Sequence, residues 1–416
     1  MPAATLLLIA RGAKDKHLTV NPQFSYWRFA HRRHTPFAMA MTEMTTAGDT
    51  GWGGLCRIAL DGRGDLVHDC FLSVELPALS VTGPGPSPLV QWCPKLGHAL
   101  VEYVELAIGG EVIERQTGEF MEVFTQLTMT ADRKHGYNNM IGHKGSLLNP
   151  AASIGPQLLY IPLGFWFCNR SGCALPLLAI QCQEVEIRVK FRQAAELYQT
   201  NDAANVVTCG ALENVSLFAN YVYLSEPERR MFLNNELNYL MEQVQINEPA
   251  EIGGPNGTTF DLDFAHPVKE LFFVCQRTQA RSSEFATQSG YPNYNDRFNY
   301  SSSAVVGQGS NMVDRIYLKI NGMDVADSSD PQFFNLYQPW RYHTGAPDVG
   351  VFCYSFALKP EDFQPSGHAD FTRFQTANLK IEFNDAVSPP CYVSVYAWGY
   401  NVLTVKGGQA ALEYVC

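Results

Sequence analysis

Apolar and polar residues alternate in short runs along this chain, and turn-forming residues separate the runs. Glu184–Phe191 (EVEIRVKF) alternates apolar and charged residues with a period of two, which predicts a strand with one face in water. Further strands are predicted at Ser216–Leu224, Lys269–Cys275, Val313–Ile320 and Tyr392–Val405. The 33 Gly and 24 Pro punctuate such runs throughout the sequence. This pattern is typical of an all-β protein built as a sandwich or a barrel.

Helical periodicity is rare. In residues 119–129, four apolar residues recur at i, i+3, i+4 and i+7 and predict one apolar helical face: Phe120, Val123, Phe124 and Leu127. A second helix is expected after Ser225, because Ser225 and Glu228 have the spacing of a capping box and Pro227 is tolerated in a first turn. This helix would run to about Leu233, between two strand regions, and is a candidate connector between domains.

An internal repeat is the most informative feature of the sequence. Residues 101–113 (VEYVELAIGGEVI) and residues 313–325 (VDRIYLKINGMDV) align at an offset of 212. Each copy reads as a strand, a tight turn and a second strand. The turns are Gly109-Gly110 and Asn321-Gly322, which suit hairpins whose two central residues need positive φ.

Further similarities follow in the same order in both halves. An aromatic segment follows each hairpin, with Phe120 and Phe124 in the first copy and Phe333, Phe334 and Tyr337 in the second. The strand ending at Phe191 resembles the one ending at Phe383, and residues 216–224 resemble residues 393–405. We therefore predict two tandem eight-stranded jelly-roll sandwiches with a few short helices in loops and at the connector. The predicted division is an N-terminal arm (1–23), a first jelly roll (24–224), a connector helix (225–235) and a second jelly roll (236–416).

Composition adds a hint about surfaces. Of the 416 residues, 46 % are hydrophobic and 12 % aromatic, but only 17 % are charged. Low charge with many aromatic residues is typical of permanent interfaces. A large, ordinary β-protein core is the alternative explanation.

Charge is unevenly distributed. The net charge of −11 argues against nucleic-acid binding by the chain as a whole, and no sequence-specific nucleic-acid contact is expected. Residues 1–34 nevertheless carry six basic residues against Asp15 alone, namely Arg11, Lys14, Lys16, Arg28, Arg32 and Arg33. Such a basic arm could contact a polyanion, an anionic membrane or an acidic partner; a few solvated charges are the alternative.

Targeting and redox signals are weak. The apolar run Thr5–Ala10 is too short for a signal-peptide core and ends at Arg11, and no segment approaches the length of a membrane span. The 11 cysteines are scattered, odd in number and without a CxxC pair. They indicate reduced, mostly buried thiols.

Catalytic and metal-binding motifs are missing from the sequence. There is no H-x-H, HExxH or G-x-S-x-G motif, and Gly307-Gln308-Gly309 lacks the lysine of a phosphate-binding loop. His31 and His34 flank Arg32 and Arg33, a poor environment for a cation. We expect no catalytic residue, no cofactor and no metal site.

Four Asn-x-Ser/Thr sequons occur, at Asn169, Asn214, Asn256 and Asn299. Asn256 and Asn299 lie in polar, turn-rich stretches and are the candidates for exposed, glycosylated loops. Asn169 and Asn214 lie beside apolar strands and are expected to be structural.

Six long segments, in order, resemble the double jelly-roll major capsid proteins of nucleocytoplasmic large DNA viruses, the group of phycodnaviruses and iridoviruses. They are residues 12–39, 64–77, 96–127, 159–187, 350–374 and 396–408, including the strings PLGFWFCN and YSFALKPEDFQPSG. Two departures are Pro36, where the family tends to have Asn, and His368-Ala369-Asp370, where it has Thr-Cys-Asn. The chain is also short for the group, which puts heavy surface decoration in doubt.

The resemblance implies a structural protein of the virion, not an enzyme. It implies a pseudo-hexagonal homotrimer that tiles an icosahedral shell around an internal membrane, contacts neighbouring capsomers and meets minor capsid and penton proteins. Synthesis and assembly are expected in the host cytoplasm, and the basic arm is expected to make inner-face contacts, with the membrane among the candidates. The alternatives are a minor or paralogous capsid component of the same virus type, or a carbohydrate-binding β-sandwich protein. A trimeric mass would favour the first reading, and a monomer would favour the last.

Overall fold

The computed structural model describes residues 3–252, 257–305, 308–384 and 390–414, and the chain forms two compact units, residues 1–37 and residues 38–416. The first unit carries helix α1 (Ala3–Ile9), the short turn η1 (Ala13–Asp15) and helix α2 (Lys16–Thr19), none of which buries a residue. No helix in the described part of the chain is both long enough and apolar enough to cross a membrane.

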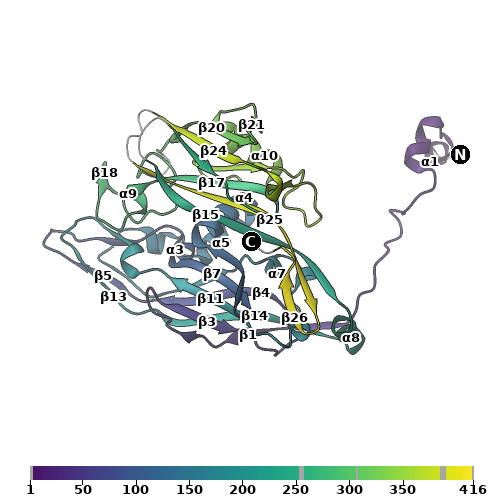
Figure 1. Ribbon diagram of the computed structural model, residues 1–416, viewed down its shortest axis with the longest axis horizontal. Helices are drawn as coiled ribbons and strands as arrows, with labels where there is room; N and C mark the ends of the chain where they lie inside the picture. Colours follow the sequence, from purple (N-terminus) through teal and green to yellow (C-terminus); the bar gives the residue numbers. More distant parts are fainter. Residues whose placement is uncertain (1–2, 253–256, 306–307, 385–389, 415–416) are drawn as a thin grey trace. The chain divides into compact units, whose positions relative to one another are not determined.

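The second unit begins with a sandwich of two antiparallel sheets (Figure 1). Their strand orders are β1-β14-β4-β10 and β2-β3-β11-β7-β8. The strands are β1 (Phe37–Met44), β2 (Ala47–Gly48), β3 (Leu55–Ala59), β4 (Leu66–Leu76), β7 (Val101–Ile108), β8 (Glu111–Thr117), β10 (Gln157–Pro162), β11 (Val185–Phe191) and β14 (Glu213–Leu224).

A second sandwich follows, with strand orders β15-β25-β17-β22 and β16-β24-β20-β21. Short strands β23 (Ala369–Asp370) and β26 (Gln409–Leu412) pair with β17 and β25. The other strands are β15 (Leu237–Ile252), β16 (Thr258–Asp261), β17 (Pro267–Arg277), β20 (Val313–Ile320), β21 (Met323–Asp324), β22 (Val351–Ser355), β24 (Ala377–Phe383) and β25 (Cys391–Lys406).

The two sandwiches match strand for strand once the extra strands β2, β23 and β26 are set aside. In both, the first, last, third and sixth strands form one sheet, and the second, seventh, fourth and fifth form the other. Eight strands in this order form a jelly roll. The predicted fold class, two tandem eight-stranded jelly rolls, is confirmed, and we call them the first roll and the second roll.

The internal repeat corresponds to the hairpins β7–β8 and β20–β21. Gly109 and Gly110 have φ of 62° and 89°, and Asn321 and Gly322 have φ of 50° and 79°. Both turns therefore place two residues in the left-handed region, as the sequence predicted. The strands ending at Phe191 and Phe383 pair with β7 and β20 respectively, so these similarities also reflect one shared topology.

All five strand predictions are confirmed, as β11, β14, β17, β20 and β25. In β11 every second residue is buried, as its alternation requires. Both helix predictions are also confirmed, as α4 (Gly118–Thr128) and α8 (Glu226–Asn234). The predicted capping box is wrong, however, because the side chain of Ser225 makes no capping hydrogen bond; the backbone carbonyl of Ser225 accepts from the N–H groups of Glu228 and Arg229 instead.

Short elements fill the connections. The helices are α3 (Leu96–Leu100), α5 (Ala131–Met140), α6 (Gly145–Leu148), α7 (Trp166–Asn169), α9 (Thr278–Arg281) and α10 (Gln338–Tyr342), with the π-helical turn η5 (Phe333–Tyr337) and the turns η2 (Ser171–Cys173), η3 (Leu177–Ala179), η4 (Ala194–Glu196) and η6 (Phe371–Arg373). The strands are β5 (Leu79–Thr82), β6 (Val90–Trp92), β9 (Ser153–Ile154), β12 (Tyr198–Thr200), β13 (Val206–Cys209), β18 (Thr287–Gln288) and β19 (Tyr291–Pro292).

Two apolar cores hold the rolls together. The core of the first roll continues into the second roll and includes Phe272 and Tyr396. Their strand neighbours Leu271 and Val395 belong to the second roll's own core. Because successive residues of a strand point to opposite faces, sheet β15-β25-β17-β22 is buried on both sides. Seven of the ten cysteines among the described residues are buried, as the sequence predicted for most of them.

Candidate functional site

Helix α4 of the first roll packs against the outer face of the second roll's sheet β15-β25-β17-β22, where Figure 1 shows it between the two rolls. The ring of Phe120 lies 5.6 Å from that of Tyr396 and 6.3 Å from that of Phe272. Phe124 meets Trp398 edge to face at 4.9 Å. The helix starts at Thr117, whose hydroxyl accepts a hydrogen bond from the N–H of Phe120. We call this contact the seam; it joins the two rolls into one body.

The corresponding sheet of the first roll has an aromatic outer face that is only partly covered. Phe71 and Phe218 lie opposite each other on β4 and β14, and their rings stack at 5.0 Å. Tyr160 meets Phe71 edge to face, and Met39 and Met41 extend the apolar surface along β1. Met39 is 56 % exposed. We call these five residues the open face.

The segment η5–α10 follows the hairpin of the second roll as α4 follows that of the first. It exposes Leu336, Tyr337 and Trp340, and Trp340 is 76 % exposed. The rings of Tyr337 and Trp340 lie 6.0 Å apart. We call these three residues the α10 patch. The chain thus has one open sheet face and one exposed aromatic helix. The open face is the first roll's equivalent of the sheet face in the seam, and the α10 patch is the second roll's equivalent of helix α4.

Buried charges reinforce the seam. The ammonium group of Lys95 lies 2.5 Å from the carboxylate of Glu122 and 3.2 Å from that of Asp348, so it bridges the two rolls. His98 contacts Glu122 at 2.8 Å through Nδ1, and its Nε2 lies 2.8 Å from the hydroxyl of Tyr137. Burial alone would raise the pKa of Glu122, but Lys95 and His98 hold it below its ordinary value.

Lys269 is a second buried charge, on strand β17. Its side chain is fully buried, and Nζ lies 2.6 Å from Glu242 and 3.2 Å from the ring centre of Trp398. Burial lowers the pKa of Lys269 to about 8, against the opposing effect of Glu242. The ion pair and the cation–π contact offset part of the desolvation cost.

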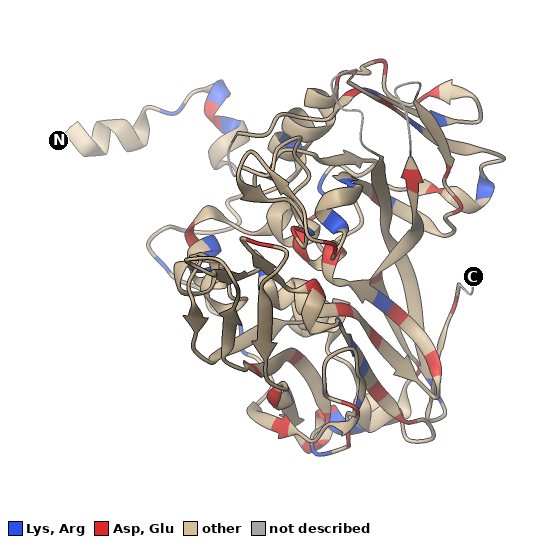
Figure 2. Cartoon of the chain, turned by 90° about the vertical axis from the view of Figure 1, so that its left-hand side faces the viewer, with Lys and Arg blue, Asp and Glu red and all other residues tan. Residues whose placement is uncertain are grey.

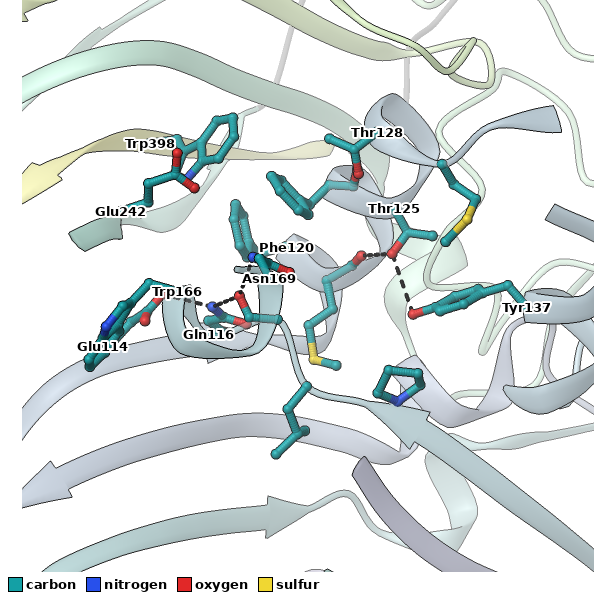
Figure 3. A pocket seen from close by; sticks show the side chains of 16 residues that line it. Glu114, Gln116, Phe120, Thr125, Thr128, Tyr137, Trp166, Asn169, Glu242 and Trp398 are labelled. Atoms are coloured by element: carbon teal, nitrogen blue, oxygen red, sulfur yellow. Dashed lines mark hydrogen bonds between the residues drawn. The ribbon is translucent and has the colours of Figure 1, made fainter. Parts of the chain in front are cut away.

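A cavity of about 210 Å³ lies along the seam and is drawn in Figure 3. Gln116 donates hydrogen bonds to Glu114 and to the backbone carbonyl of Gly164, and the hydroxyls of Thr125 and Tyr137 lie 3.5 Å apart. Burial raises the pKa of Glu114 to about 8, so this carboxyl is mostly protonated at neutral pH. Ligand pockets usually have roughly 300–1,000 Å³. The smaller volume fits a packing void.

A larger cavity of about 930 Å³ lies between loops of the two rolls, and Asn299 lines it. Asn299 is partly buried, and its Nδ2 donates to Asp296 at 2.8 Å and to the carbonyl of Ser303 at 2.9 Å. The expected exposure of this sequon is therefore wrong. Attachment of a glycan to Nδ2 would replace one of its two hydrogens and therefore remove at least one of these hydrogen bonds.

Two of the other sequons lie at the surface. Asn169 and Asn214 are exposed, although apolar strands flank them in the sequence, and Asn214 donates to Glu75 at the start of β14. Asn256 lies outside the described residues. Both exposed asparagines lie at the end of a helix or strand, and the polarity of the neighbouring sequence did not predict this exposure.

A third buried polar group combines Glu270, His343 and Cys353. No metal site was expected from the sequence, because these residues have no characteristic spacing. The sheet β17–β22 and the end of α10 bring them together. Only long-range contacts could have revealed this cluster.

The N-terminal unit exposes all six basic residues that the sequence singled out: Arg11, Lys14, Lys16, Arg28, Arg32 and Arg33. Figure 2 colours the Lys and Arg residues of the chain blue. Four aromatic residues between the basic ones, Phe24, Tyr26, Trp27 and Phe29, are exposed as well. Mixed basic and aromatic side chains are typical of segments that contact a lipid–water interface.

Family models match nearly the whole chain. The model described as "Major capsid protein N-terminus" matches residues 25–225, and the one described as "Large eukaryotic DNA virus major capsid protein" matches residues 228–411. A major capsid protein of Pyramimonas orientalis virus is 31 % identical, and one of Phaeocystis pouchetii virus is 30 % identical; each alignment covers 100 % of both chains.

Solved structures share the fold. The PBCV-1 capsid protein VP54 aligns with a TM-score of 0.79 at 24 % identity, over 94 % of this chain and 100 % of that one. The major capsid protein of Faustovirus aligns with a TM-score of 0.78 at 12 % identity, over 95 % and 94 % of the two chains.

Proposed function

The chain belongs to the major capsid proteins of large eukaryotic DNA viruses, and we propose that three copies form a pseudo-hexagonal capsomer through the open face and the α10 patch. The chain is thus a structural component of the virion's capsid. The trimer, the surfaces that form it and its surroundings in the virion are our proposals.

One observation supports the trimer most directly. Within the chain, Phe120 of α4 sits against Phe272 and Tyr396, which are directly opposed on β17 and β25. The open face presents the equivalent opposed pair, Phe71 and Phe218. The α10 patch occupies the position of α4 in the second roll. A neighbouring copy can therefore repeat the seam contact between chains.

Such a contact joins two different surfaces and is head to tail. A head-to-tail contact forms a ring if the rotation per step closes. Because the rolls alternate around that ring, three chains supply six similar rolls and give a pseudo-hexagonal outline. The low charged fraction of the chain, 17 %, agrees with large permanent contacts.

Native mass spectrometry of the purified chain and two charge variants tests the trimer. The wild type should have about three times the 46.3 kDa of one chain. Trp340→Asp in the α10 patch and Phe218→Asp on the open face should each give mostly single chains, because each places a carboxylate in an apolar contact. The matched control is Met323→Asp, because Met323 is 71 % exposed on β21 outside both surfaces.

Two outcomes would contradict this proposal. A monomeric wild type would contradict the trimer. Trimers that survive both Trp340→Asp and Phe218→Asp would place the interface elsewhere.

The trimer is proposed to tile an icosahedral shell around an internal membrane, beside neighbouring capsomers and above minor capsid and penton proteins. Assembly is proposed in the host cytoplasm. We retain the boundaries 1–23, 24–224, 225–235 and 236–416 for the arm, the rolls and the connector. Glycosylation of Asn256 and Asn299 stays a prediction.

The basic segment of residues 1–34 is proposed to face inward and to contact anionic lipid. Its six basic residues and its exposed Trp27 and Phe29 support this role. The full chain should co-sediment with vesicles that contain anionic lipid, and less with zwitterionic vesicles. Deletion of residues 2–23 removes Arg11, Lys14 and Lys16 and should weaken that binding. Unchanged binding and unaltered shell assembly after the deletion would contradict the proposal.

A further inference from the structure

Glu270, His343 and Cys353 meet at the edge of the seam. Glu270 lies on β17, Cys353 on β22, and His343 directly follows α10. Glu270 and Phe272 share one face of β17, and Phe272 pairs with Cys353. The cluster therefore lies on the sheet face that is turned toward the first roll.

The three side chains are close together and shielded from water. One oxygen of Glu270, a ring nitrogen of His343 and the sulfur of Cys353 all lie within 4.8 Å of one another. The side chains of Glu270 and His343 are both 0 % exposed, and Cys353 is 0 % exposed. The second carboxylate oxygen of Glu270, Oε2, is buried and has no hydrogen-bond partner. A buried, unpartnered carboxylate oxygen is a place where a cation would be stabilised.

His343 is oriented as metal-binding histidines usually are. Its Nε2 lies 2.7 Å from Glu270, and its Nδ1 lies 3.0 Å from Oε1 of Glu361. A carboxylate on the far nitrogen of a histidine fixes the ring and raises its basicity in many metal sites. Glu361 also accepts a hydrogen bond from the N–H of Thr344, so its own position is fixed.

We propose that Glu270, His343 and Cys353 bind one zinc ion, with Glu361 positioning the imidazole. The ligand set of one thiolate, one imidazole and one carboxylate suits zinc and excludes magnesium and calcium, which prefer oxygen ligands. The free oxygen Oε2 of Glu270 can supply a further contact by bidentate binding.

Zinc replaces protons at this site without changing its charge. In the zinc-free chain, the Glu270 carboxylate raises the pKa of His343 to about 12, although burial alone would lower it, and burial raises the pKa of Cys353 to about 12. The site then holds an imidazolium, a thiol and two carboxylates. Zinc displaces one proton from His343 and one from Cys353, so the net charge is the same before and after binding.

The ligand atoms must move before they can bind one ion. Two tetrahedral zinc ligands at about 2.0–2.1 Å from the ion are about 3.3 Å apart. His343 Nε2 and Glu270 lie 2.7 Å apart, so the imidazole must move by about 0.6 Å. His343 ends a helix and begins a loop, where such a shift distorts no sheet.

A zinc ion here would strengthen the seam. The residues after His343 contact the end of α4: the hydroxyl of Thr344 donates to the carbonyl of Thr128, and the N–H of Gly345 donates to that of Leu127. Zinc would tie this loop to β17 and β22. The site lies within one chain and does not depend on trimer formation.

The test uses the full-length chain, purified without chelators and dialysed. Elemental analysis should find close to one zinc per chain, and removal of zinc by EDTA should lower the melting temperature. Replacement of zinc by cobalt should give a sulfur-to-cobalt charge-transfer band. Cys353→Ser should lose that band and the effect of EDTA. Glu361→Gln should keep the fold and weaken zinc binding about 10- to 100-fold.

The matched control is Cys275→Ser. Cys275 is equally buried on β17 but belongs to the second roll's own core, so this variant should bind zinc as the wild type does. The proposal is overturned if the wild type retains no more zinc than Cys353→Ser. It is also overturned if the cobalt-loaded wild type lacks the charge-transfer band, which does not require any variant to fold.

Discussion

Two equivalent sheet faces of this chain have opposite environments. In the second roll, the opposed pair Phe272 and Tyr396 is buried beneath helix α4. In the first roll, the opposed pair Phe71 and Phe218 stacks on a face that is only partly buried. One topology thus places an aromatic pair at the same position twice, and only one pair is covered within the chain.

The sequences of the two faces reflect this difference. Every residue of β17 from Val268 to Arg277 is buried, whereas four of the eleven residues of β4 are partly exposed. Continuous burial allows charged groups only in paired form, as with Lys269 and Glu242. The comparison teaches that this face of the second roll is specialised for contact within the chain, whereas the equivalent face of the first roll has no such cover among the described residues.

Truncation of one ring on each side should give the largest contrast. Phe120→Ala leaves a cavity in the buried seam and should lower the free energy of unfolding by about 3–5 kcal/mol. Phe218→Ala should cost about 1 kcal/mol in single chains, because its ring is already partly exposed. Urea denaturation, at concentrations where native mass shows only single chains, measures both values.

Met323→Ala serves as the control for this pair. Met323 is 71 % exposed, so its truncation should change the free energy of unfolding by less than about 0.5 kcal/mol. Equal costs for Phe120→Ala and Phe218→Ala would contradict the contrast between the covered and the open face.

Burial also gives the seam its own pH dependence, through Glu114. The pKa of Glu114 is raised from 4.5 to about 8. Between pH 4.5 and pH 8 the folded chain therefore keeps a proton on Glu114 that the unfolded chain has lost. The stabilisation is complete below about pH 4.5 and is lost as the pH rises through about 8. Glu114→Gln removes this titration. Relative to pH 5, the variant should therefore gain about 4 kcal/mol over the wild type at pH 8.5, at roughly 1.36 kcal/mol for each pH unit between 5 and 8.

Denaturation curves of both proteins between pH 5 and 8.5 check this expectation. Parallel stability profiles for wild type and Glu114→Gln would show that the carboxyl of Glu114 is not neutral in the folded chain.

Local patterns predicted the fold well, for a physical reason. Strand alternation in β11, the helical spacing of Phe120 and Phe124, and the hairpin turns each depend on neighbours within a few residues. Because the same local patterns recur in the same order in both halves, the repeat also predicted two copies of one fold. Helix α5 was missed because it has no apolar stripe and buries none of its residues.

The candidate site could not be predicted in the same way. Glu270, His343 and Cys353 come together only when β17, α10 and β22 pack, and Lys95 reaches Asp348 across 253 residues. The exposure of Asn299 failed as a prediction for a similar reason. Its polar surroundings form a partly buried hydrogen-bond network with Asp296 and Ser303 instead of an open loop.

The smallest effect concerns the two hairpin turns, where the rolls should behave alike. Gly110 and Gly322 have φ of 89° and 79°, and an added Cβ would meet nothing within 4 Å at either position. Gly110→Ala and Gly322→Ala should therefore each cost about 1–2 kcal/mol, from backbone strain alone. Gly136→Ala is the control: an added Cβ has open space there too, but Gly136 lies within helix α5, so the change should stabilise the chain by about 0.5–1 kcal/mol. Urea denaturation measures all three. Unequal losses in the free energy of unfolding would mean that the two hairpins share their backbone shape but contribute differently to stability.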